Sequence, residues 1–71
     1  MEIRVADSDD MLDLLHFLRA NGCIAYVTGG AQVIEALRPD MPRATDAEAA
    51  QIGRLVERWL VENPAAKLLP Q

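Results

Sequence analysis

Four carboxylates and one imidazole lie close together near the N-terminus, and side chains of these types could hold a metal ion. The residues are Asp7, Asp9, Asp10, Asp13 and His16. Carboxylate oxygens bind Mg²⁺ and Ca²⁺, and a bound ion could activate water for hydrolysis. However, the spacing matches no calcium-binding loop, and aspartates also suit the first turn of a helix, where the helix dipole favours negative charge. Asp13 and His16, three residues apart, can pair across one turn. We therefore expect a capped helix with a solvated face and no metal, and we keep a Mg²⁺-dependent enzyme as an alternative.

The pair Gly29-Gly30 could form a phosphate-binding loop or the tight turn of a hairpin. A Walker-type loop needs a lysine after its glycines and a dinucleotide loop needs three spaced glycines, and neither pattern is present. Two adjacent glycines tolerate the positive φ angles of a two-residue hairpin turn. We therefore predict a hairpin of residues 23–28 and 31–36, in which Tyr26 lies opposite Val33. A short helix over residues 31–38 is the alternative.

The remaining reactive side chains do not form a catalytic set. Ser8 is the only serine and His16 the only histidine, so no Ser-His-Asp arrangement can be built. Cys23 follows a predicted helix end, where the dipole disfavours a thiolate, and we expect it to be a buried small hydrophobe. Trp59 lies on an apolar helical stripe, so we place it in the core. We expect no enzymatic activity, no catalytic residue and no cofactor.

Two helices and two further strands are indicated around the hairpin. Residues 2–5 alternate between polar and apolar side chains, as a half-buried strand does. The first helix is capped by Asp7 or Ser8 and ends at Asn21-Gly22. Its buried stripe comprises Met11, Leu14, Leu15 and Leu18. The second helix opens with the capping box of Thr45 and Glu48. Its stripe comprises Ile52, Val56, Trp59 and Leu60, and Asn63-Pro64 ends it. Residues 65–69 can form one short strand before Pro70.

This order, β-α-β-β-α-β, predicts an α+β, ferredoxin-like fold with a four-stranded antiparallel sheet and two helices on one face. The chain resembles small uncharacterised actinobacterial proteins built on this pattern, including the stretch RANGCIAYV between the first helix and the second strand. The resemblance implies the fold and no known activity.

Size and charge narrow the classes of partner. The chain has 71 residues, a formal net charge of −4 and one cysteine. We expect one domain that does not bind nucleic acid, which requires a basic face. No window approaches the length of a membrane span, and the N-terminus lacks the features of a signal peptide. The single cysteine indicates a reducing, cytoplasmic setting.

The face of the sheet turned away from the helices is the best candidate for a binding site. It would carry Arg4, Ile24, Tyr26, Val33 and Glu35, an apolar patch with charged residues at its rim. Such a patch is typical of a contact between proteins. We therefore predict an interaction module that pairs with another protein or with itself as a homodimer. The alternative is a regulatory domain of the ACT type that binds a small ligand.

Overall fold

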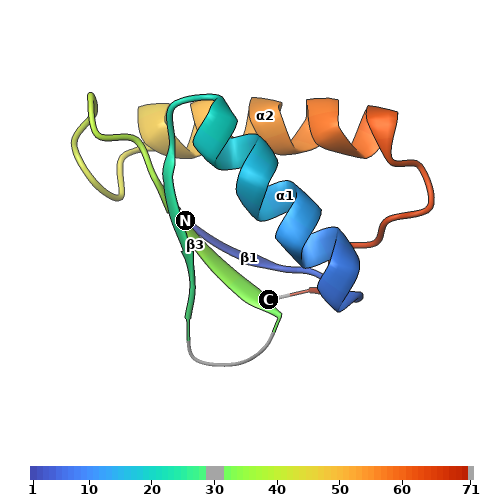
Figure 1. Ribbon diagram of the computed structural model, residues 1–71. Helices are drawn as coiled ribbons and strands as arrows, with labels where there is room; N and C mark the ends of the chain where they lie inside the picture. The colour runs from blue at the N-terminus through green and yellow to red at the C-terminus, as the bar shows by residue number, and fades with distance from the viewer. Residues whose placement is uncertain (29–31, 71) are drawn as a thin grey trace.

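The computed structural model describes residues 1–28 and 32–70, in which two helices pack on one face of an antiparallel sheet (Figure 1). The elements, in chain order, are β1 (Glu2–Arg4), α1 (Ser8–Ala20), β2 (Ile24–Val27), β3 (Val33–Leu37) and α2 (Asp46–Glu62). The strand order in the sheet is β1-β3-β2, so the last strand in sequence lies in the middle. The α+β class and both helices are as predicted.

The predicted hairpin forms, but its register differs from the expected one by two residues. Tyr26 lies opposite Glu35, where a two-residue turn would have placed it opposite Val33. Residues 33–37 are a strand, so the alternative of a helix over 31–38 was wrong. A shift of two residues keeps each side chain on the same face of a sheet. The predicted faces therefore hold, while the turn at Gly29-Gly30 lies outside the described residues.

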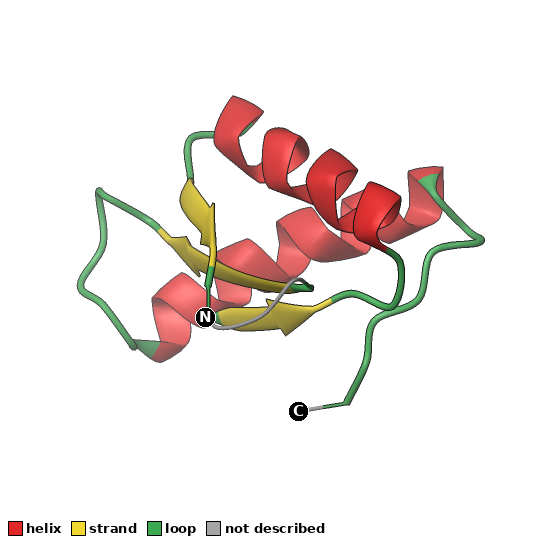
Figure 2. Cartoon of the chain, turned by 60° about the horizontal axis from the view of Figure 1, so that its bottom comes forward, coloured by secondary structure: helices red, strands yellow, loops and turns green. Residues whose placement is uncertain are grey.

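The predicted fourth strand was wrong, because the sheet has three strands. The segment after α2 returns beside β1 (Figure 2), where Val5 and Leu68 form one isolated antiparallel bridge. Two hydrogen bonds hold it, from the Ala6 N–H to the Lys67 carbonyl at 3.0 Å and from the Leu69 N–H to the Arg4 carbonyl at 2.9 Å. The next residue is Pro70, which has no N–H to donate, so the ladder stops after a single bridge.

Both helices begin at the predicted caps. The Asp7 carboxylate accepts hydrogen bonds from the backbone N–H groups of Asp9 and Asp10, at 2.8 and 3.3 Å. The Thr45 hydroxyl accepts from the Glu48 N–H at 3.2 Å. These bonds satisfy N–H groups that have no partner inside the helix. After α1, Gly22 adopts a φ of +87°, a left-handed conformation that glycine tolerates and that ends the helix.

The core lies between the helices and the inward face of the sheet. Every strand contributes alternate residues to it, and the helices contribute the predicted stripes. Its members are Ile3, Val5, Met11, Leu14, Leu15, Leu18, Cys23, Ala25, Ile34, Ala36, Ile52, Val56 and Trp59. Cys23 and Trp59 are therefore core residues, as predicted. With both helices on this side, the opposite face of the sheet is left without a covering element (Figure 1).

Candidate functional site

The surface of interest is the open face, which we define as the side of the sheet away from the helices. Strand alternation and the observed register place seven side chains on it: Glu2, Arg4, Ile24, Tyr26, Val33, Glu35 and Leu37. All five side chains predicted for the contact surface are among them. Leu37 was missed, although it continues the alternation of Val33 and Glu35 by one more step.

The apolar members of the open face lie together on β2 and β3. Ile24 and Tyr26 are 49% and 45% exposed, which is high for large apolar side chains in neighbouring positions of one strand face. Ile24 lies opposite Leu37, and Tyr26 lies opposite Glu35. Since directly opposed side chains on one face are about 5 Å apart, these residues form a continuous surface. Val33 and Leu37, on the central strand, are half-buried.

The charged members lie toward β1. Arg4 is opposite Val33, and Glu2 is opposite Glu35. The Glu35 carboxylate forms an ion pair of 3.2 Å with the N-terminal ammonium group, which also donates to the Ala36 carbonyl at 2.8 Å. The open face is therefore apolar on β2, carries Val33, Leu37 and the charged Glu35 on β3, and carries Glu2 and Arg4 on β1.

The acidic residues before and within α1 make separate contacts. Asp7 is occupied by capping the helix. Asp13 accepts a hydrogen bond of 2.8 Å from the indole N–H of Trp59, and the ion pairs of the described residues do not include one between Asp13 and His16. Among the residues that the structure describes, no three His, Cys, Asp or Glu side chains come together in an arrangement that could hold a metal ion.

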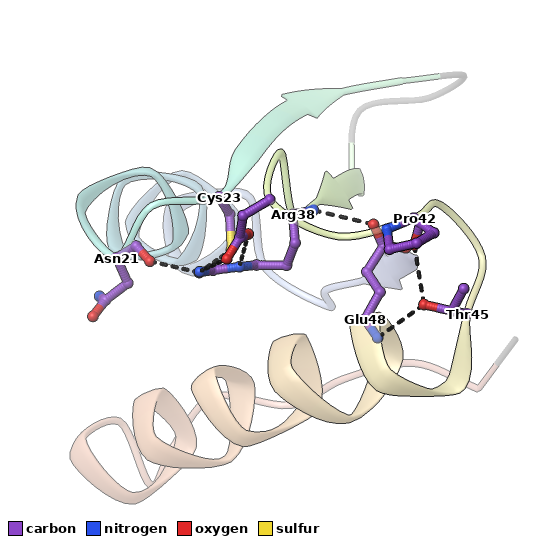
Figure 3. A network of polar contacts seen from close by, with 7 residues as sticks. Asn21, Cys23, Arg38, Pro42, Thr45 and Glu48 are labelled. Atoms are coloured by element: carbon purple, nitrogen blue, oxygen red, sulfur yellow. Dashed lines mark hydrogen bonds and ion pairs between the residues drawn. The ribbon is translucent and has the colours of Figure 1, made fainter.

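A second polar cluster joins the end of β3 to the start of α2, and sequence reasoning missed most of it (Figure 3). The Glu48 carboxylate is 2% exposed and accepts from the backbone N–H groups of Arg38 at 3.1 Å and Ala44 at 3.0 Å. These two bonds lower the pKa of Glu48, because they stabilise its ionised form. The capping box predicted a return bond from the Thr45 N–H to Glu48, whereas the carboxylate accepts from Ala44 and Arg38. With both oxygens engaged, Glu48 holds the loop in place and is not available as a base.

The side chain of Arg38 also makes several polar contacts. It forms a two-pronged ion pair with Asp40, at 3.2 and 3.4 Å, which lowers the pKa of Asp40 and raises that of Arg38. The same guanidinium donates to the Asn21 carbonyl at 2.9 Å and approaches the Cys23 sulfur at 4.0 Å (Figure 3). These contacts use its donors to connect β3 with the turn after α1. The cluster is therefore structural, and the open face remains the candidate site.

Comparison with known proteins adds no family to this geometry. No protein-family model, curated protein or solved structure matches the chain. Within the described residues, neither helix has the length and apolar character needed to cross a lipid bilayer.

Proposed function

We propose that this protein is an interaction module that associates with a second copy of itself through the β2 side of its open face. One observation carries the proposal: Ile24 and Tyr26 are both nearly half exposed on a sheet face that no helix covers. Exposed apolar side chains scattered singly need no explanation, but large neighbouring ones on a flat surface favour contact with another protein.

The charges of the open face suit pairing between two identical surfaces. In a two-fold interface, a contact between one residue and another occurs twice, with the roles of the copies exchanged. The open face carries both a cation, Arg4, and an anion, Glu35, on adjacent strands. The open face is therefore not uniformly charged, and two copies can meet without like charges opposing each other throughout.

The size of the open face sets the expected affinity. Three strands about 4.8 Å apart and five residues of about 3.3 Å give a footprint of roughly 240 Å². Stable interfaces bury about 800 Å² per partner, and weak ones bury less. We therefore expect weak association, which requires measurement over a wide concentration range.

Sedimentation velocity between about 5 µM and 1 mM tests the proposal. The wild-type protein should shift from monomer toward dimer as the concentration rises. Tyr26→Glu should weaken association at least tenfold, because it places a further negative charge beside Glu35 on both copies. Val61→Glu is the matched control, since Val61 is 80% exposed on α2, away from the open face, and should leave association unchanged.

A wild-type protein that stays monomeric over the whole range would overturn the proposal. So would a dimer that Tyr26→Glu and Val61→Glu weaken equally, because such a dimer would respond to total charge and not to the open face. Circular dichroism of each variant confirms that the fold is retained before association is compared.

A further inference from the structure

No strand of the described residues lies beside the outer edge of β2, where Val27 is 41% exposed and Ala25 is 4% exposed. In an antiparallel ladder, successive residues direct their N–H and C=O groups alternately to one side and the other. The Thr28 N–H donates to the Val33 carbonyl at 3.0 Å, so Thr28 and Tyr26 face β3. Ala25 and Val27 therefore direct their N–H and C=O groups away from the sheet. The opposite edge of the sheet, on β1, is already bonded to residues 67–69.

The outward groups are the N–H and C=O of Ala25 and of Val27, four in all, and Arg19 is bonded to one of them. Its Nε–H, reaching from the last turn of α1, donates to the Ala25 carbonyl at 2.8 Å. Within residues 1–28 and 32–70, the Ala25 N–H and both backbone groups of Val27 have no bonding partner. An edge strand with open donors and acceptors is a template for strand addition, and a charged side chain on it restrains that reaction.

We infer that β2 pairs antiparallel with β2 of a second copy, with the two Tyr26 side chains opposite each other on the two-fold axis. This register sets Ala25 of one copy opposite Val27 of the other. It uses all four outward groups of each strand, in four hydrogen bonds between the copies. The inference rests on the proposed self-association and specifies how the two copies meet.

The small area of the open face favours this arrangement over stacking of the two faces. A footprint of roughly 240 Å² is well below the surface that a stable stacked dimer needs. Edge pairing adds directional hydrogen bonds and joins the two open faces into one continuous surface. Ile24 and Tyr26 of both copies then lie at its centre, where cross-strand aromatic and β-branched pairs stabilise a sheet.

Arg19 acts in this arrangement as a restraint on pairing. In the separate chain it satisfies the Ala25 carbonyl and holds a positive charge at the edge. In the pair, the Val27 N–H of the second copy donates to that carbonyl, so the two donors compete. Because each copy contributes one such carbonyl, removing the Arg19 side chain should tighten association on the order of thirtyfold, the factor expected for two net hydrogen bonds.

Amide hydrogen exchange measured by NMR at about 20 µM and about 1 mM tests the inference. The amides of Ala25 and Val27, unbonded in the separate chain, should exchange at least tenfold more slowly at the higher concentration. The Tyr26 amide is the internal reference, because it already faces β3. Sedimentation of the same samples reports whether a dimer is present.

The outcomes separate the inference from the proposed function. A dimer in which the Ala25 and Val27 amides exchange as fast as in the monomer overturns edge pairing and leaves self-association standing. A protein that is monomeric at 1 mM overturns both. Arg19→Ala should tighten association, with Arg54→Ala on the exposed side of α2 as the control. Equal affinities for the two folded variants would overturn the role of Arg19.

Discussion

Replacement of Asp13 by alanine should destabilise the protein, because it removes the hydrogen-bond partner of a buried indole. Trp59 is 1% exposed, and its N–H donates to the Asp13 carboxylate at 2.8 Å. A buried donor left without a partner costs about 1–3 kcal/mol. Asp13 itself is exposed, so water can partly replace its carboxylate, and we take a cost of about 1.5 kcal/mol. Alanine favours the helix over aspartate by about 0.5 kcal/mol, which leaves a net loss of about 1 kcal/mol.

Urea denaturation followed by circular dichroism measures this loss. With a denaturant slope of about 1 kcal/mol per molar urea, the midpoint should fall by about 1 M. The melting temperature should fall by about 4–8 °C for a chain of this size. Glu57→Ala is the control, since it removes an exposed carboxylate from the middle of α2 and should change the stability by less than about 0.5 kcal/mol.

A double-mutant cycle decides whether the effect passes through the hydrogen bond. In a Trp59→Phe background the donor is absent, so Asp13→Ala should cost nothing and should gain about 0.5 kcal/mol of helix propensity. If Asp13→Ala unfolds at the wild-type urea concentration, or costs as much beside Phe as beside Trp, the hydrogen bond does not stabilise the fold as argued.

Two further predictions concern the loop cluster and the core. The N–H groups of Arg38 and Ala44 lower the pKa of Glu48 in the folded state. The ionised carboxylate therefore contributes its full stabilisation above the ordinary glutamate pKa of about 4.3. That stabilisation is lost as the pH falls through the lowered pKa of the folded state. Glu48→Gln should therefore reduce the acid dependence of the urea midpoint below about pH 4.3, and an unchanged dependence would contradict the assignment. Leu14→Ala should lower the free energy of unfolding by about 2–5 kcal/mol, because it leaves a cavity in the core. Leu12→Ala, on the exposed side of the same helix, should lower it by less than about 1 kcal/mol in thermal unfolding. Equal losses would show that α1 packs by another face.

The parts of the fold that local chemistry specifies were predictable from the sequence. Asp7 and Thr45 cap helices because their side-chain oxygens accept from N–H groups only two or three residues later in the sequence. Such a contact depends on neighbouring residues and not on the packing of distant segments. The alternation of β2 and β3 likewise assigned side chains to faces, since the period of a strand is two residues. This is why the five predicted side chains lie on the open face, although Leu37 was missed and the hairpin register differs by two residues.

The errors arose where segments distant in sequence compete for the same backbone groups. The predicted and observed hairpin registers differ by two residues and bury Ile34 and Ala36 equally, so the alternation of side chains does not choose between them. The number of strands depends on how many hydrogen bonds residues 67–69 form beside β1. They form two, which make one isolated bridge and not a strand.

The sequence by itself determined two capped helices, the inward and outward faces of the strands, and an acidic chain with one buried cysteine. Only the tertiary structure decided that Asp13 bonds to Trp59, that Arg38 and Glu48 close the loop before α2, and that the Arg19 side chain bonds to the Ala25 carbonyl on β2. The physical reason is the range of the interactions. Caps and periodicity act within one or two turns of chain, whereas a partner for a buried or edge group is set by whichever element the packed core brings beside it.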